Sequence, residues 1–183
     1  SIPRGFYLIA ITHILFMLAD MVRPMVVFVD LFIEVFGGGL FEIGIYEAIF
    51  GVFFAVACLP VLKVGKEKGL GMILLGLLLV SAADAVLAFS NKIIYAFAAA
   101  IFHSVGGAIM SPYYMDILFS KVPKEVRGTL LGSLSAIGKL LRIITPALAG
   151  LMASISPQLP YIASLLIGLA GIPTLIMAVK PKH

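Results

Sequence analysis

Charged residues are scarce in this sequence, and tryptophan is absent. Only 12% of the 183 residues are Asp, Glu, Lys or Arg, whereas a soluble domain carries about 25%. Hydrophobic residues make up 62% of the chain, which excludes a water-soluble globule. In lipid only helices and closed barrels satisfy their own backbone hydrogen bonds. The apolar runs are far longer than the roughly 10-residue strands of a barrel, so the sequence predicts an all-α membrane protein.

Cysteine and the usual catalytic patterns are also missing. Cys58 is the only cysteine, so it can form no intrachain disulfide, and we expect it to be a small buried hydrophobe. No His, Cys and acidic residues stand at metal-ligand spacing, and no Gly-rich loop follows a strand to cradle phosphate. An intramembrane enzyme would need a nucleophile beside a base, which the sequence does not supply. We therefore expect no enzymatic activity, metal or cofactor.

Six apolar runs, separated by turns rich in Gly, Lys and Pro, have the length of about 20 residues that crosses a bilayer as a helix. The predicted spans of this six-transmembrane-helix bundle are Phe6–Val29, Leu40–Leu62, Leu70–Phe89, Ile93–Leu118, Arg127–Ser154 and Leu159–Val179. The first run has full span length, so we expect no cleaved signal peptide. In the fifth span, Gly128 and Gly132, and Pro146 and Gly150, have the four-residue spacing that predicts close helix packing.

Lysine and arginine in the loops predict the orientation, because the cytoplasmic side retains them. Alternate loops and chain ends on one side hold Arg4, Lys63, Lys66, Lys68, Lys121, Lys124, Arg127, Lys180 and Lys182. The other side holds only Lys92. Both termini are therefore predicted to be cytoplasmic, in a multi-pass protein of the cell (plasma) membrane. The net charge of +4 is explained by topology, and we expect no nucleic-acid partner.

The segment VPKEVRGTLLGSLSAIGKLLRIITPALAGLM, Val122–Met152, resembles a loop and helix of major facilitator superfamily transporters. In that family a pattern like D…P…RG…G…GP..GG joins the fourth helix to the fifth helix of each half. The matching residues are Asp116, Pro123, Arg127, Gly128, Gly132, Pro146 and Gly150. Thr145 and Ala149 stand where antiporters of the family often carry glycine, which argues against an antiporter.

The segment LPVLKVGKEKG, Leu59–Gly69, is similar to another loop of the family, which reads roughly GxxxDRxGRR and latches neighbouring helices. Lys63, Gly65 and Lys66 keep its basic and glycine positions, whereas Leu62 replaces the acid. Such a degraded latch is commoner in the second half of these transporters, so the resemblance implies a C-terminal half. It also implies that both loops take part in the conformational change, the other one through Asp116, Arg127 and Gly128.

A complete family member has two six-helix halves with the substrate between them near the midplane. The resemblance therefore implies that this chain is one half of a secondary active transporter that moves a small solute by alternating access. Its partner is either a preceding half that is missing from the chain or a second copy. The alternative is a six-helix scaffold or regulatory subunit that transports nothing.

Charges inside spans cost a few kcal/mol each and are functional candidates by default. The ionisable residues here are His13, Asp20, Arg23, Glu47, Asp84, His103, Lys139 and Arg142. At 1.5 Å per residue, Asp20, Lys139 and Arg142 lie about 21, 18 and 22 Å from the cytoplasmic starts of their helices. His103 lies about 15 Å from the outer end of its helix. These four are thus predicted to gather near mid-membrane.

Ser135, Lys139 and Arg142 share one helix face by their spacing. The fifth helix lines the central cavity in the resembled family, so these residues are the first candidates for substrate binding. His103 and Tyr114 on the fourth span are further candidates. Two cations on one face favour an anionic or carboxylate-bearing substrate. The alternative is a structural ion pair of these cations with Asp20 or Asp84, and His103 as a structural residue.

Asp20 is the candidate for proton coupling. A carboxylate in a low-dielectric cavity favours its neutral form, and it can load and release a proton as access alternates. Arg23 stands one helical turn away, so a simple Asp20–Arg23 pair is the competing interpretation.

Overall fold

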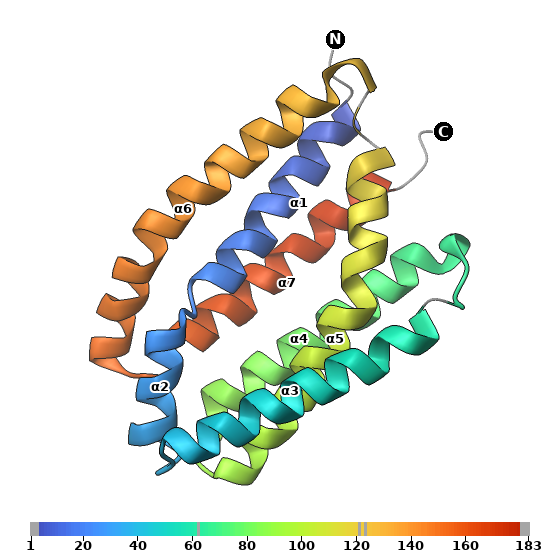
Figure 1. Cartoon of the computed structure of the whole chain (residues 1–183). Helices are drawn as coiled ribbons and strands as arrows, with labels where there is room; N and C mark the ends of the chain where they lie inside the picture. The colour runs from blue at the N-terminus through green and yellow to red at the C-terminus, as the bar shows by residue number, and fades with distance from the viewer. Residues whose placement is uncertain (1–3, 62, 121, 123, 180–183) are drawn as a thin grey trace.

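The computed structural model describes residues 4–61, 63–120, 122 and 124–179, and every regular element in these ranges is helical (Figure 1). The elements are α1 Arg4–Met21, α2 Met25–Glu34, α3 Leu40–Val61, a short 3-10 turn Lys66–Lys68, α4 Gly69–Phe89, α5 Ile93–Ser120, a second 3-10 turn Lys124–Val126, α6 Arg127–Ile155 and α7 Leu159–Val179. In this part of the chain, the five helices α3 to α7 are long and apolar enough to cross a membrane. The chain therefore has the character of an integral, multi-pass membrane protein.

The first predicted span, Phe6–Val29, is not one continuous helix. The structure divides it into α1 and α2 and extends it to Glu34, with a break over residues 22–24. Pro24 has no N–H to donate to the preceding turn, and its ring disfavours the α-conformation of Arg23. Pro24 itself is extended, with φ −66° and ψ 159°, and it caps the start of α2. Arg23 thus lies at the break itself.

The helices α4 and α7 form the central pair of the bundle. α4 packs against α7, α5 packs against α4, and α1 packs against α7. Of the other three helices, α3 lies on α5, α6 lies on α1, and the short α2 contacts α6. Both chain ends lie at the same end of the bundle, together with the α3–α4 and α5–α6 connections (Figure 1).

This packing has an internal symmetry. If the first three spans, namely α1 with α2, α3 and α4, are exchanged in order for α5, α6 and α7, the α4–α5 pair corresponds to the α7–α1 pair, the α3–α5 pair to the α6–α1 pair, and the α4–α7 pair to itself. Consecutive spans run in opposite directions, so the first and fourth spans are antiparallel. These correspondences have the pattern of an inverted repeat of three helices, whereas the α6–α7 contact has no counterpart of similar extent between α3 and α4 in the described residues.

Glycine allows a close approach of the backbones of α4 and α5. A Cβ atom added to Gly76 would lie 2.5 Å from the Gly106 carbonyl oxygen, and one added to Gly106 would lie 2.6 Å from the Gly76 carbonyl oxygen. The predicted close packing at Gly128, Gly132 and Gly150 is wrong within the described residues, since no atom lies within 4 Å of a Cβ built there. These glycines are exposed because α6 contacts the bundle along only one narrow stripe.

Two apolar clusters fill the bundle, one towards each end. The cluster at the end with the termini includes Ile9, Ile73 and Leu175, and the other includes Leu31 and Phe32. Of the residues named from the sequence, Leu62, Lys121, Pro123, Lys180 and Lys182 lie outside the described part of the chain. Polar residues occupy the level between the two clusters, and they form the candidate site.

Candidate functional site

The break in the first span gives Arg23 its position. Val22 still donates its N–H to the Leu18 carbonyl at 3.0 Å, but the helix stops there. The Arg23 side chain then turns back, and its Nε donates to the Ala19 carbonyl at 3.3 Å. A side-chain N–H thus bonds the carbonyl that a backbone N–H would bond in a continuous helix. The same local structure therefore ends the helix and places the guanidinium.

Arg23 forms a buried ion pair with Asp84 of α4. The Arg23 Nη1 atom lies 3.0 Å from the Asp84 Oδ1 atom, and the two side chains are only 8% and 3% exposed. Ser164 of α7 donates its hydroxyl to the other carboxylate oxygen, Oδ2, at 2.7 Å. An isolated charge would be very unfavourable at this depth, so the pair and the hydroxyl explain how Asp84 is accommodated. The cluster joins three spans.

His103 of α5 lies on the other side of the guanidinium from Asp84. Its two ring nitrogens are both 3.3 Å from Arg23 Nη1. An imidazole nitrogen accepts a hydrogen bond only when it carries no proton. The ring of Phe50 meets His103 edge-on, with centroids 5.5 Å apart. His103 is therefore a partner of Arg23 within the bundle.

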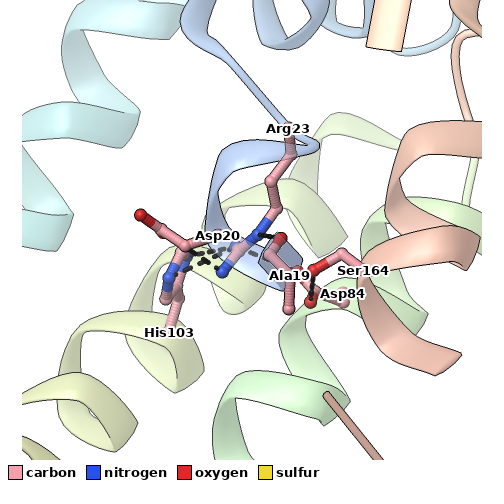
Figure 2. Close-up of polar contacts among 6 residues, drawn as sticks. All are labelled: Ala19, Asp20, Arg23, Asp84, His103 and Ser164. Atoms are coloured by element: carbon pink, nitrogen blue, oxygen red, sulfur yellow. Dashed lines mark hydrogen bonds and ion pairs between the residues drawn. The ribbon is translucent and has the colours of Figure 1, made fainter. Parts of the chain in front are cut away.

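Asp20 contacts the same guanidinium from the open side. Its Oδ1 atom lies 3.7 Å from Arg23 Nη2, and its side chain is 72% exposed. Figure 2 shows Asp20 and His103 on one side of Arg23, and Asp84 with Ser164 on the other. Asp20 and Arg23 therefore form the pair that was one interpretation of the sequence. The shorter and more buried contact of Arg23, however, is to Asp84.

Ser135, Lys139 and Arg142 are all exposed on α6. The buried residues of that helix are Leu134, Gly138, Thr145 and Ala149. Among the described residues, Arg142 forms no ion pair with Asp20 or Asp84. Arg142 and Asp20 nevertheless line one cavity of about 290 Å³, together with Met21, Arg23, Pro24, Thr145 and Pro146.

Tyr114 is separated from this group. It is buried, and its hydroxyl lies 3.1 Å from His13 Nδ1, so it joins α5 to α1 nearer the end with the termini. The His13 and Tyr114 rings are stacked with centroids 5.8 Å apart. The structure brings Arg142 and Asp20 together, holds His103 against Arg23, and places Tyr114 elsewhere.

A second cavity of about 230 Å³ also includes Arg23 in its wall. It is lined by Arg23, Met25, Phe28, Tyr46, Glu47, Phe50, Leu87, His103 and Tyr161. The buried Tyr161 hydroxyl has no hydrogen-bond partner among the described residues. Arg23 is thus shared between the walls of two cavities. Within the described ranges, no three His, Cys, Asp or Glu side chains gather as metal ligands.

The two connections that resemble family loops are held by hydrogen bonds to helix ends. Arg127 Nη2 donates to the carbonyls of Phe119 and Val122, at 3.1 and 3.3 Å, and so ties the start of α6 to the end of α5. Asp116 and Gly128 are exposed nearby. Free carbonyls at the end of a helix need such partners.

Tyr113 of α5 does the same for the end of α3. Its hydroxyl lies 3.3 Å from the Val61 carbonyl oxygen and 3.1 Å from that of Val64. Lys63 is exposed and Gly65 is half-buried in this connection, and Lys66 begins the 3-10 turn that follows. Tyr113 could not be singled out from the sequence, because a tyrosine in an apolar helix has no distinctive spacing.

No family model matches the chain, and no curated protein matches it.

Proposed function

We propose that this chain is one six-span half of a secondary active transporter of the major facilitator type, and that it moves a small solute by alternating access. The first and broken span counts as one crossing, made of α1 and α2. The loop motifs favour a C-terminal half. The partner in this proposal is either an N-terminal half or a second copy of the chain.

One observation carries the proposal. Lys139 and Arg142 are exposed near the middle of α6, which has the length and composition of a membrane span. Asp20, exposed near the end of α1, lines the same cavity as Arg142. Charged side chains at that depth do not face lipid, but face the bundle interior, a partner or a water-filled cavity. An open polar face at mid-depth is what a transporter half presents to its other half.

The helix contacts are a second support for the same proposal. Major facilitator halves consist of two inverted groups of three helices, and the matching of α4–α5 with α1–α7 and of α3–α5 with α1–α6 agrees with that arrangement. A scaffold has no need of such an internal symmetry.

Cysteine labelling of α6 in native membranes tests the polar face. In a Cys58→Ser background, Ser135→Cys should react with a membrane-impermeant thiol reagent, because only a hydrated thiol forms the reactive thiolate. The matched controls Leu140→Cys and Ile144→Cys are exposed on the opposite face of the same helix and should stay unlabelled. Equal labelling of both faces, or none at Ser135, would contradict the proposal.

Transport itself needs a second measurement. The purified chain in proteoliposomes, with a pH gradient and a panel of organic acids and amino acids, should accumulate at least one solute. The active species should contain two six-span units, since a single half lacks one cavity wall. Uptake by a demonstrated monomer would contradict the half-transporter architecture, and a hydrated face without any flux would favour the scaffold alternative.

A further inference from the structure

We propose that the cavity between α1 and α6 binds a small zwitterion of the α-amino acid class, with its ammonium group on Asp20 and its carboxylate on Arg142. This inference rests on the proposed function and names the substrate class of the same open face. It changes the expectation from the sequence, where the two cations of α6 favoured a simple anion.

The cavity has the scale of such a solute. Its volume is about 290 Å³, and Asp20, Arg142 and Arg23 are the charged residues among its lining. Drug-sized ligands occupy roughly 300 to 1,000 Å³, so a cavity at the lower limit suits a molecule of a few heavy atoms. Thr145 donates its hydroxyl to the Leu141 carbonyl at 2.7 Å, so that proton is not available to a ligand.

The charge of Arg23 is already offset by Asp84, so Arg23 neutralises the Asp20 carboxylate only in part. Arg23 lies 3.0 Å from the buried Asp84 and only 3.7 Å from Asp20. Asp20 is also largely exposed, at 72%, whereas Asp84 is enclosed. A guanidinium shared in this way stabilises Asp20 less than Asp84, and the open side of Asp20 faces the cavity.

Arg142 is the positively charged counterpart of Asp20 in the wall of this cavity. It is exposed and makes no ion pair with any acidic side chain in the described residues. Lys139 lies one turn nearer the start of α6 and does not line the cavity. The cavity therefore presents one carboxylate that is only partly neutralised and one guanidinium without an ion-pair partner in the described residues, carried by two different helices.

A zwitterion is the one simple charge class that satisfies both groups. A monocarboxylate would bind Arg142 but be repelled by Asp20, and a primary amine would bind Asp20 but be repelled by Arg142. A carboxylate also matches the planar fork of arginine in a bidentate geometry. A compact molecule with both charges gains both contacts and meets neither repulsion.

Binding to the purified chain in detergent tests the inference. The probes are L-alanine, L-leucine and L-phenylalanine, each beside its carboxylate analogue (propionate, 4-methylpentanoate, 3-phenylpropionate) and its amine analogue (ethylamine, isopentylamine, phenethylamine). Isothermal titration should give at least one amino acid that binds at least about tenfold more tightly than both of its analogues, since one lost ionic contact of about 1.4 kcal/mol is a factor of ten. A carboxylate analogue that binds as tightly as every amino acid overturns the inference, and so does the absence of binding by all three amino acids.

Two variants assign the ends of the ligand. Asp20→Asn should weaken the amino acid about tenfold and leave the carboxylate analogue unweakened, whereas Arg142→Gln should weaken the amino acid and leave the amine analogue unweakened. Glu34→Gln and Lys92→Gln remove one exposed charge of each sign outside both cavities and should leave the affinities unchanged. Unchanged amino acid affinity in either cavity variant overturns the assignment. Binding without flux in proteoliposomes would refute transport and keep the zwitterion site, and uptake restricted to simple anions would do the reverse.

Discussion

The Arg23 guanidinium lies 3.0 Å from the Asp84 carboxylate, and this buried pair fixes the break of the first span against α4. Each charge is tolerable in the membrane only because the other is present. Replacing both charges by neutral groups is often less damaging than removing one, because a single deletion leaves an uncompensated buried charge. The pair is therefore a structural element whose two members should be strongly coupled.

Asp84→Asn should destabilise the chain by about 3 to 5 kcal/mol, the usual effect of deleting one member of a buried ion pair. Asp20→Asn is the matched control and should change stability much less, because Asp20 is 72% exposed. The double variant Arg23→Gln/Asp84→Asn should be more stable than Asp84→Asn alone. Thermal melting in detergent, followed by the far-UV circular dichroism of this all-helical chain, measures all three. An unchanged melting temperature for Asp84→Asn would show that the pair contributes no net stability.

Helix positions could be predicted from the sequence because apolar length and turn residues determine them locally. The predicted span Leu70–Phe89 lies over α4, Gly69–Phe89. The break at Pro24 could not be predicted by the same reasoning. Pro112 and Pro146 lie inside continuous helices, and the sequence does not tell these cases apart. The difference depends on Arg23, whose partner lies on a distant helix.

The candidate site was predictable as a set of residues but not as a set of contacts. Asp20, Arg142 and His103 stood out because charge in an apolar span is rare. Their partners depend on which helices become neighbours, so the Arg23–Asp84 pair and the hydroxyl of Ser164 appear only in the folded bundle. Glycine spacing had the same limit, since it indicates a possible contact without identifying the helix face that is covered.

The α4–α5 contact provides a second prediction. Gly76→Ala should lower the melting temperature, because the new Cβ would lie 2.5 Å from the Gly106 carbonyl oxygen and one helix backbone must move. Overpacking of this kind typically destabilises by about 1 to 3 kcal/mol. Gly71→Ala is the control on the same helix, where no atom lies within 4 Å of the added Cβ. Equal melting temperatures for the two variants would show that the helices separate without loss of stability.

The membrane orientation is the third prediction. In a Cys58→Ser background, Lys63→Cys and Lys124→Cys should react only with a reagent supplied from the cytoplasm, and Asn91→Cys only with a reagent supplied from outside. The physical reason is the retention of basic loops on the cytoplasmic side. Labelling of Lys63→Cys from outside intact cells would reverse the orientation.

Proton coupling through Asp20 is the fourth prediction. In proteoliposomes, Asp20→Asn should abolish uphill uptake driven by a pH gradient but keep downhill exchange measurable. The amide resembles the permanently protonated carboxyl group, so the carrier can no longer load and release a proton in each cycle. The rates should be compared at solute concentrations that saturate the variant, because Asp20 also contacts the proposed ligand. Unchanged pH-driven accumulation would leave Asp20 as a partner of Arg23 alone.

Arg142 gives the last prediction, because its exposure separates a binding role from a structural one. Lysine keeps the positive charge but lacks the planar fork that holds a carboxylate in a bidentate geometry. Arg142→Lys should therefore weaken the binding of any carboxylate-bearing ligand by about tenfold, which corresponds to roughly 1.4 kcal/mol. Arg142→Ala should abolish detectable binding yet melt within a few degrees of the unmodified chain, since among the described residues Arg142 has no ion-pair partner to leave buried. Titration of each variant with the tightest-binding carboxylate-bearing ligand, beside its melting curve, measures affinity and stability separately. Full affinity in Arg142→Lys would show that the carboxylate does not bind Arg142, and a large loss of stability in Arg142→Ala would place Arg142 in the packing of the bundle.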